Sequence, residues 1–524
     1  MFRRFLTTLI DQQISSTQDF FATKSPFFPV PGLESLEWLY NVAPCFPIKG
    51  DHIKIIYEPQ DFYETILEKC STAQKRIVLA SLYLGTGGLE NALVQTMHKK
   101  LKDNSNLSVS ILLDFTRGTR GEVSSKSILL PLVREHKNFS LSLYHTPALR
   151  GITKRLAPPR WNELVGLQHM KVYLFDDTVV ISGANLSNDY FTNRQDRYIL
   201  IEDKPLADFY SRLIAKVQEF SLSVQSDSEE RLHHSWNLFP YKGVKYDFVT
   251  EAQQRVHSFF EDVFRCQEIK SQEREEADTW IFPLVEMGQL GIHHDSVVTK
   301  KLLNCSIGGS KLKLATGYFN LTQEYMETIT NNCLAHCSIL MAHPNANGFQ
   351  GAKGPAGGIP AAYSLIARKF YESLVLAGQD SRVNFFEYQK DGWSYHAKGL
   401  WYYLPNCTLP NLTLIGSSNF GERSVNRDLE AQVCIVTSNE NLQTKLQAEV
   451  DNLYKLGSTA ENAITQRPVP KWVQAVVKIF SINHDNVYIS RTDLQRANYL
   501  PPKHHLCFIN IGSNIRRGNI SSLN

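Results

Sequence analysis

The sequence predicts an α/β protein built from two repeated domains, each a mixed sheet flanked by helices. Two observations support this fold class. The chain carries an internal duplication, because a run that begins at Cys70 aligns without gaps on a run that begins at Cys305. Within each half, stretches with helical periodicity also alternate with runs rich in β-branched residues, as in sheets that are covered by helices.

The duplication keeps the order and the spacing of the matched residues. Ser110-Ile-Leu corresponds to Ser338-Ile-Leu (338 − 110 = 228), and His169-Met-Lys corresponds to His396-Ala-Lys (396 − 169 = 227). Because these offsets are nearly constant, we expect both halves to contain the same elements in the same order.

The individual elements follow from local patterns. An amphipathic stretch predicts a helix, and apolar runs bounded by turn residues predict strands. The expected elements are a helix over residues 62–73 and strands over residues 76–84, 107–113, 171–175, 179–182, 399–403 and 412–415.

The same patterns divide the chain into five segments. The segments are an N-terminal segment (1–45), a first repeat (46–224), a connector with some helix (225–280), a second repeat (281–458) and a C-terminal helix and tail (459–524). In the first segment, Arg3 and Arg4 lie among apolar and hydroxyl residues, as in mitochondrial targeting sequences. Asp11 and Asp19 argue against that interpretation, and a frayed terminus is the alternative.

The composition excludes some classes of function. The 524 residues include 55 basic and 52 acidic side chains, a formal net charge of +3, which is too balanced for a nucleic-acid coat. No uncharged apolar run approaches the roughly 18 to 20 residues of a membrane-spanning helix, so any membrane contact is expected to be peripheral. The stretch 469–480 with Trp472 is a candidate interfacial helix, although packing on the second repeat explains it equally well.

The nine cysteines do not form the dense framework of a small secreted domain, so we expect them to be reduced. Cys333 and Cys337 flank His336, but no second pair of ligands follows. We therefore interpret the two thiols as packing at a helix end, and we expect no metal or cofactor.

Two short motifs carry the chemistry. His169 and Lys171 lie two residues apart at the start of a strand-like run, so both side chains point to the same face. His396 and Lys398 repeat this arrangement in the second half. An imidazole and an ammonium on one face can bind a phosphate, and the two pairs together predict one site shared by the two repeats.

The first motif continues to an aspartate seven residues after its histidine. Asp176 holds that position, whereas the second half has Tyr403 there. Because seven is odd, the strand geometry points Asp176 away from His169, and a structural salt bridge is the expected role of its carboxylate.

A small-residue turn with an asparagine follows each motif. Asn185 lies in Ser182-Gly-Ala-Asn-Leu-Ser187, and Asn419 lies in Gly416-Ser417-Ser-Asn-Phe-Gly. Such turns present backbone N–H groups and an amide to an anion, with Ser187 and Ser417 as supporting hydroxyls.

A carboxylate lies eleven residues beyond each asparagine. The two carboxylates are Asp196 (196 − 185) and Glu430 (430 − 419). We expect each one to accept the Nδ1–H of the histidine in its own half, which leaves Nε2 free to attack or to donate a proton.

Further phosphate contacts are expected from three basic residues. Arg117 and Arg120 lie in a strand-to-helix loop, and Lys353 lies in the glycine-rich stretch 348–358; ordinary solvated loops are the alternative. The loop that runs from Ala80 through Gly85, Thr86 and Gly87 resembles a nucleotide phosphate loop. It lacks the Lys-Ser/Thr pair that holds phosphate and magnesium, so an ordinary strand end is the favoured interpretation.

These residues resemble the phospholipase D superfamily, whose signature His-x-Lys-x4-Asp with a following Asn turn occurs twice. Among its branches, the chain is similar to the mitochondrial phosphatidylglycerophosphate synthase family over about residues 46–480. The stretches that carry the resemblance are 80–87, 113–121, 166–175, 190–198 and 396–401. The second motif departs from the signature at Tyr403, and the tail after about residue 480 lies outside the pattern.

The resemblance implies two phospholipase D-like domains that share one active site at their interface. It implies transfer of the phosphatidyl group of CDP-diacylglycerol to glycerol 3-phosphate, without metal, to give phosphatidylglycerophosphate, a precursor of phosphatidylglycerol and cardiolipin. His169 would be the nucleophile and His396 the general acid and base, and the reverse assignment stays open. The protein would be mitochondrial and peripheral to the inner membrane.

Two other functions remain at this stage. The first is a phospholipase D-like phosphodiesterase that acts on another phospholipid or on nucleic acid, against which the near-neutral charge argues. The second is an inactive membrane adaptor that keeps the fold, against which both complete sets of His, Lys and Asn argue. The sequence gives no indication of the oligomeric state.

Overall fold

The structure is a computed structural model that describes residues 32–151, 165–270 and 276–478. These residues belong to two compact units, Met1–Val469 and Pro470–Asn524. In the second unit, residues 471–478 form a helix, within the stretch where an interfacial helix is predicted. The predicted targeting residues up to 31 and the tail after 478 lie outside the described residues, and all further description concerns the first unit.

The first half of the chain forms one mixed sheet. Its strands are β2 (Ile53–Ile56), β3 (Arg76–Ala80), β4 (Ser108–Asp114), β5 (Phe139–Tyr144), β6 (Val172–Phe175), β7 (Thr178–Ser182), β9 (Tyr198–Glu202), β10 (Leu222–Val224) and β11 (Glu230–Leu232). Their order is β11-β10-β5-β4-β3-β6-β7-β9-β2, with β3, β4 and β5 parallel and the remaining neighbours antiparallel.

The second half forms another mixed sheet. Its strands are β1 (Phe46–Ile48), β12 (Thr279–Met287), β13 (Ile292–His293), β14 (Lys311–Thr316), β15 (His336–Ala342), β16 (Val383–Tyr388), β18 (Gly399–Tyr403), β19 (Leu412–Gly416), β20 (Leu429–Thr437) and β21 (Gly457–Thr459). Their order is β1-β12-β20-β19-β18-β14-β15-β16-β21, with β13 on β12. The strand β1 comes from the start of the segment assigned to the first repeat, yet it pairs with β12 in the second sheet.

The two sheets have the same strand order, which confirms the predicted fold class. The path β5-β4-β3-β6-β7-β9-β2 of the first sheet matches β16-β15-β14-β18-β19-β20-β12 of the second, and three parallel strands lie at corresponding places in each. The predicted strands agree with β4, β6, β7, β18 and β19 to within a residue or so. The strand predicted over 76–84 ends earlier, at Ala80, because the Ser81 hydroxyl bonds the carbonyl of Tyr83 (3.0 Å) and turns the chain.

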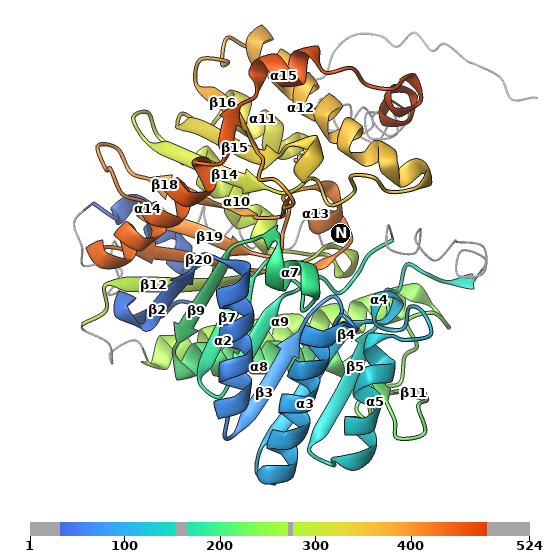
Figure 1. Ribbon diagram of the computed structural model, residues 1–524. Coiled ribbons are helices and arrows are strands. Elements are labelled where there is room, and N and C mark those ends of the chain that lie inside the picture. Colours follow the sequence, from blue (N-terminus) through green and yellow to red (C-terminus); the bar gives the residue numbers. More distant parts are fainter. Residues whose placement is uncertain (1–31, 152–164, 271–275, 479–524) are drawn as a thin grey trace, which may run out of the picture. The chain divides into compact units, whose positions relative to one another are not determined.

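Helices cover both faces of each sheet (Figure 1). Those of the first half are α2 (Pro59–Thr72), α3 (Gly88–Asp103), α4 (Phe115–Gly118), α5 (Ser125–Glu135), α7 (Asn188–Thr192), α8 (Lys204–Glu219) and α9 (Lys245–Lys270). Those of the second half are α10 (His294–Asn304), α11 (Gln323–Asn331), α12 (Ile359–Leu376), α13 (Glu422–Asn426), α14 (Glu440–Tyr454) and α15 (Glu461–Gln466). Along the whole chain, 3-10 turns lie at Glu34–Asn41, Gly50–His52, Gly288–Leu290, Pro344–Ala346 and Gly354–Gly358.

Three hydrophobic cores follow from this layering. One lies under α2, α3 and α5, and a second lies under α10, α11 and α12. The third contains residues of both sheets together with α8, α9 and α14, so it joins the two halves. The long helix of the predicted connector, α9, therefore belongs to the shared core through side chains such as Phe248 and Phe259.

A buried arginine ties the halves together. Arg197 donates to both carboxylate oxygens of Glu449 on α14 (2.9 and 2.8 Å) and to the Thr413 hydroxyl on β19 (2.8 Å). Its guanidinium also stacks on the ring of Trp401, 3.8 Å from the centroid. Because Arg197 follows Asp196 directly, this anchor also positions the start of β9 against the second half.

Cys333 and Cys337 lie in the second hydrophobic core just after α11, with their sulfurs 3.9 Å apart. The described cysteines are free thiols. This is the packing role that the sequence predicts for the pair.

Candidate active site

Both His-x-Lys motifs lie where the two halves meet. His169 precedes β6, and His396 precedes β18. The side chains are buried, with residue exposures of 8% for His169 and 4% for His396, and both lysines are fully buried. The structure therefore brings together the four residues that the sequence singled out.

The carboxylates cross between the halves. His169 Nδ1 lies 2.9 Å from Oε2 of Glu430, and His396 Nδ1 lies 2.6 Å from Oδ2 of Asp196. We expected each carboxylate to serve the histidine of its own half, and that expectation is wrong. Neither His-x-Lys motif is therefore paired with the carboxylate of its own half.

Backbone pairing between the halves explains the crossing. The N–H of His169 donates to the carbonyl of Leu429 (2.8 Å), next to Glu430. The N–H of His396 donates in the same way to the carbonyl of Gln195 (2.8 Å), next to Asp196. The short strands β8 (Arg194–Gln195) and β17 (Ser394–Tyr395) continue the pairing before His396 in parallel, and Gln168 forms a parallel bridge with Leu429 before His169. Each motif is thus held against the carboxylate segment of the other half.

The two lysines stand beside their histidines. Lys171 Nζ donates to the carbonyl of His169 (2.8 Å), and burial lowers the pKa of Lys171 to about 7. Lys398 Nζ donates to the carbonyl of His396 (2.6 Å) and also lies 3.4 Å from Oδ2 of Asp196. Burial lowers the pKa of Lys398 as well.

Burial also lowers the pKa of both histidines, so both are neutral in the free protein at pH 7. For His396 the Lys398 ammonium adds to this effect, whereas for His169 the Glu430 carboxylate opposes it. Burial raises the pKa of the Asp196 and Glu430 carboxyls, but nearby charges lower it by more. At Asp196 these charges are Lys398 and His396, and at Glu430 the largest contribution comes from His169. Both carboxylates are therefore ionised and accept the Nδ1–H of their histidines.

The two asparagines have amide oxygens without partners in the described structure. Oδ1 of Asn185 and Oδ1 of Asn419 are buried and accept no hydrogen bond there. A buried amide of this kind is costly unless a ligand satisfies it, and the assignment of O and N in such an amide can be exchanged. The supporting hydroxyls are bound within the protein: Ser187 contacts the Tyr83 hydroxyl (3.1 Å), and Ser417 bonds the backbone of Ala431.

Asp176 lies away from this cluster. It occupies the turn after β6 with a positive φ of 52°, and its carboxylate accepts the backbone N–H groups of Gln74, Lys75 and Arg76 (2.8, 2.7 and 3.0 Å). Five residues of strand place it roughly 17 Å from Lys171. Backbone capping therefore replaces the salt bridge expected for Asp176, while Tyr403 donates to Gln447 on α14 (2.8 Å).

The three predicted basic residues lie in different surroundings. Arg117 lies in α4, and its guanidinium stacks on Tyr83, 4.4 Å from the ring centroid. Arg120 follows the helix and is partly buried. Lys353 is exposed before the turn Gly354–Gly358. Arg117 is thus connected to the site, since the Tyr83 hydroxyl contacts Ser187.

A carboxylate occupies the loop that resembles a phosphate loop. Ala80 is buried at the end of β3, and Glu90 of α3 reaches back over Gly85 and Gly87. A Cβ on Gly85 would lie 2.2 Å from Glu90 Oε1, and the same oxygen accepts the N–H of Asn188 (2.6 Å). An anionic side chain in this position disfavours a phosphate at Thr86 and its neighbours.

Sequence reasoning missed an aromatic and basic group around His396. The Tyr190 hydroxyl lies 3.3 Å from His396 Nε2, and the ring of Tyr318 lies 5.5 Å from the imidazole. Arg194 stacks on Tyr190, 4.7 Å from its centroid. Tyr190 and Arg194 lie five and nine residues after Asn185, where the second half has Ser424 and Asp428, so the duplication itself could have drawn attention to these positions.

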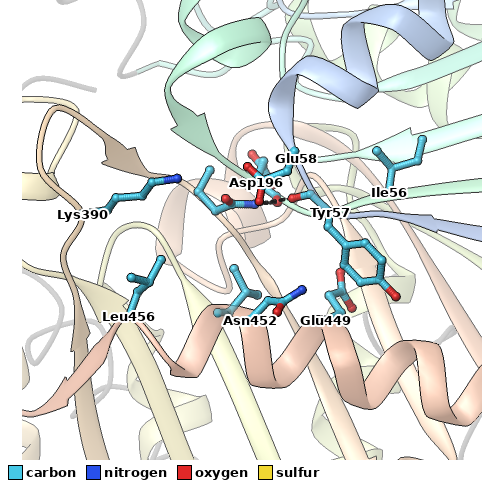
Figure 2. Close-up of a pocket in the computed structure, with 10 residues that line it drawn as sticks. Ile56, Tyr57, Glu58, Asp196, Lys390, Glu449, Asn452 and Leu456 are labelled. Atoms are coloured by element: carbon cyan, nitrogen blue, oxygen red, sulfur yellow. Dashed lines mark hydrogen bonds between the residues drawn. The ribbon is translucent and has the colours of Figure 1, made fainter.

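A glutamate lies beside each of the two carboxylates that contact the histidines. Glu286 on β12 is the cross-strand partner of Glu430 and is buried, and Nδ1 of the partly exposed His293 lies 2.7 Å from its Oε1. The register of β2 and β9, extended by two residues, places Glu58 opposite Asp196. Figure 2 shows Glu58 beside Asp196 in a small cavity. Its other lining residues are Ile56, Tyr57, Gln195, Lys390, Glu449, Asn452, Leu453 and Leu456.

Two groups in the described residues bring possible metal-binding atoms within 4.8 Å of one another. One is His98 with Glu135 and His136 near the surface, and the other is His169 with Asp428 and Glu430. In the second group, Glu430 already accepts from His169 and Ser424, and Asp428 accepts from Arg423. Hydrogen bonds thus account for the donor atoms of this group.

Known proteins resemble the chain in sequence and in fold. A family model described as cardiolipin synthase, PLD-like domain, matches residues 66–218. A relative from Gallus gallus is 44% identical over 482 residues, with 86% of each chain covered, and one from Homo sapiens is 43% identical over 478 residues with the same coverage. Both are named CDP-diacylglycerol–glycerol-3-phosphate 3-phosphatidyltransferase, mitochondrial.

More distant matches agree. A Saccharomyces cerevisiae protein with the same enzyme name is 34% identical over 459 residues and covers 82% of this chain and 87% of its own. The crystal structure of phosphatidylserine synthase from Haemophilus influenzae superposes with a TM-score of 0.65 at 19% identity, covering 88% and 99% of the two chains, which shows the shared fold. The chain therefore belongs to the CDP-diacylglycerol–glycerol-3-phosphate 3-phosphatidyltransferase family, whose fold is phospholipase D-like.

Proposed function

We propose that the protein transfers the phosphatidyl group of CDP-diacylglycerol to the hydroxyl of glycerol 3-phosphate, giving phosphatidylglycerophosphate and CMP. The observation that carries this proposal is the pair of buried histidines, each oriented through Nδ1 by a carboxylate of the opposite half. Such an arrangement leaves two Nε2 atoms for one phosphorus, as a two-step displacement requires. The enzyme name shared by the relatives supports the same reaction.

In the first step, His169 Nε2 attacks the phosphorus next to diacylglycerol, and the bond to the CMP oxygen breaks. This role suits His169 because its Nε2 makes none of the described hydrogen bonds, while its Nδ1 is held by Glu430. His396 gives the proton of its Nε2 to the leaving CMP oxygen. The product is a phosphatidyl-histidine on His169.

His396 must be protonated for this step although its surroundings favour the neutral form. The diphosphate of the donor supplies the missing negative charge, because an anion beside the imidazole raises the pKa of His396. In the second step, the neutral His396 takes the proton of the glycerol 3-phosphate hydroxyl, whose oxygen attacks phosphorus and displaces His169. Protons and bonds balance over the cycle.

The remaining site residues would stabilise the transition state. Lys171, Lys398, Asn185 and Asn419 would bind the non-bridging oxygens, where preorganised donors stabilise the five-coordinate phosphorus. Arg117, with Arg120 next to it, would bind a phosphate of the nucleotide or of the acceptor.

We further propose that the protein works in mitochondria, peripheral to the inner membrane. The relatives' names carry the word mitochondrial, and the donor is a membrane lipid. Within the described residues no helix is both long and apolar enough to cross a bilayer. Association with the membrane surface is the mode of access that fits these facts.

A direct assay tests this function. Purified protein is incubated with CDP-diacylglycerol and glycerol 3-phosphate, serine or water, each with and without a chelator, and CMP and the lipid products are measured. We expect CMP release to be much faster with glycerol 3-phosphate than with serine or water, and to be unchanged by chelator. Preference for serine or water would contradict the acceptor, and loss of activity with chelator would contradict a mechanism without metal.

A further inference from the structure

One exposed segment combines aromatic and basic side chains. Residues 239–246, which follow β11 and include the first two residues of α9, are called the aromatic loop here. Their sequence is Phe-Pro-Tyr-Lys-Gly-Val-Lys-Tyr. Tyr246 is 74% exposed and Val244 is 62% exposed, which places both among the most exposed large apolar side chains of the described residues. Lys242 and Lys245 are also exposed.

The aromatic loop lies at the edge of the sheet that holds the active site. Tyr241 packs on His145, with ring centroids 4.9 Å apart, and His145 packs on Phe115, 5.0 Å away. His145 and Phe115 directly follow β5 and β4, so they lie at the carboxyl ends of parallel strands. Met170 and Lys171 directly precede β6 and lie at this same edge, because β6 starts opposite the end of β3. Figure 1 shows α4, which begins at Phe115, at this end of β4.

Contacts continue from this edge to the site. Arg117 of α4 stacks on Tyr83, and the Tyr83 hydroxyl contacts Ser187, two residues beyond Asn185. A surface that binds the aromatic loop would thus lie on the side of the site where Arg117 and Ser187 lie.

The chemistry of the aromatic loop fits a lipid surface. Lys242 Nζ lies 5.0 Å from the ring centroid of Phe239 and 5.8 Å from that of Tyr241, so its ammonium makes cation–π contacts with the aromatic side chains of the loop. Tyrosines and lysines together are typical of the interface between headgroups and acyl chains. Two acidic residues lie near the loop: Asp247, in the first turn of α9, and Glu230, which acts on Tyr241 and forms an ion pair with Lys126. The two lysines of the loop therefore leave a surplus of positive charge.

We propose that the aromatic loop docks the protein on a bilayer that contains anionic phospholipid, with Val244 and Tyr246 inserted among the headgroups and Lys242 and Lys245 paired with lipid phosphates. This inference rests on the proposed function, because it names the surface through which that site reaches its lipid donor. An exposed apolar pair elsewhere, Val375 and Leu376 on α12, lacks this chemistry, since residues 371–380 contain no lysine or arginine.

Vesicle binding of the full chain tests the inference. The protein is sedimented with vesicles of phosphatidylcholine alone or of phosphatidylcholine with phosphatidylglycerol, at low and at high salt. The variants are Lys242→Gln/Lys245→Gln and Val244→Ser/Tyr246→Ser, and the matched control is Val375→Ser/Leu376→Ser. A basic residue near an anionic membrane contributes about fivefold in affinity, so the double lysine variant should bind about 25-fold more weakly to the anionic vesicles at low salt.

The apolar variant should lose binding at both salt concentrations, and the control should bind like the unchanged protein. Equal loss in the control, or unchanged binding in both loop variants, would overturn the proposal. So would a lysine variant that binds vesicles normally but loses binding to single-stranded DNA, since that result would assign the loop to nucleic acid.

An activity assay with two forms of the donor distinguishes a failure of this inference from a failure of the proposed function. With a short-chain, water-soluble CDP-diacylglycerol, all variants should release CMP at the rate of the unchanged protein, whereas with donor embedded in anionic vesicles the two loop variants should be slower. Absence of turnover in the unchanged protein would refute the proposed function while vesicle binding stays measurable. Equal slowing on both donors would refute docking by the aromatic loop.

Discussion

The two arms of the site share one motif but differ in what surrounds it. The His169 arm gathers carboxyl groups: Glu286 lies across the strands from Glu430, and Asp428 lies nearby in an ion pair with Arg423. Burial raises the pKa of Glu286 well above its ordinary value. The His396 arm carries cations instead, with Lys398 against Asp196 and Arg194 close to the imidazole. The same duplicated scaffold thus gives its two histidines different electrostatic surroundings. The cations favour the neutral form of His396, so its role as an acid depends on the negative charge of the bound donor.

The small-residue turns differ in the same way. Gly183 is closely approached by Lys398 and Asp196, and a Cβ there would lie 2.5 Å from Lys398 Nζ. The corresponding residue of the other turn is Ser417, whose hydroxyl bonds Ala431 and adds to the hydrogen bonding of Glu430. Gly183 therefore makes room for an ion pair, whereas Ser417 supplies a hydrogen bond.

The largest effects should come from removing the histidines one at a time. His169→Ala should lower kcat by at least about 10⁴-fold and abolish the phosphatidyl-enzyme, because the nucleophile is gone. His396→Ala should lower kcat by about 10²- to 10⁴-fold yet still form some phosphatidyl-enzyme. Labelled donor and denaturing electrophoresis measure the intermediate. Labelled protein in His169→Ala, with none in His396→Ala, would reverse the two roles.

The carboxylates should come next in effect. Glu430→Gln and Asp196→Asn should each lower kcat by about 10²- to 10⁴-fold, because the histidine loses the acceptor that fixes its tautomer. Asp196→Asn should also cost about 3 kcal/mol in the free energy of unfolding, since it leaves the buried Lys398 without its carboxylate. Urea unfolding measures this difference. A larger loss of stability in Glu430→Gln would show that the two arms are not built as described.

Much of this comparison depends on how the halves dock, which local sequence patterns do not contain. Periodicity and the duplication predict the strand order, and matched intervals identify Asn185, Asp196 and their counterparts, because these signals lie within one repeat. The crossed pairing of Glu430 with His169 arises from backbone contacts between residues 261 positions apart. The proximity of Tyr190 to His396 has the same origin.

Strand geometry correctly predicts that the Asp176 side chain points away from His169, but the reasoning behind that prediction is incomplete. Counting residues predicts that its side chain points away from His169, but the residue lies beyond the strand, in a turn, where three backbone N–H groups bind it. A count of alternating faces is valid only inside a strand. Strand β6 ends at Phe175 because a turn follows it, and that turn is held by hydrogen bonds from the backbone of residues 74–76.

Substitutions at Gly183 and Ser417 should have an intermediate effect on kcat, and they test the difference between the two turns. Gly183→Ala places a Cβ against Lys398 and Asp196, whose buried atoms must move, so kcat should fall about 10- to 100-fold. Ser417→Ala removes one hydroxyl and should lower kcat by less than about tenfold. Steady-state kinetics on the matched pair decides the point. A stronger effect of Ser417→Ala would contradict the tight packing assigned to Gly183.

The smallest effect on turnover should come from the third motif position. Asp176→Ala and Tyr403→Phe should both keep kcat within about threefold, because neither side chain reaches the site. Asp176→Ala should lower the free energy of unfolding by about 1 to 3 kcal/mol through the lost backbone capping. Burial raises the pKa of Asp176, but the three backbone amides lower it by more, so this stabilisation is present above the ordinary carboxyl pKa and is lost as the pH falls. The unfolding free energies of the variant and the unchanged protein should therefore converge as the pH falls through the lowered pKa of Asp176. A difference that persists at still lower pH would contradict this account, and a large loss of kcat would return Asp176 to the chemistry of its arm.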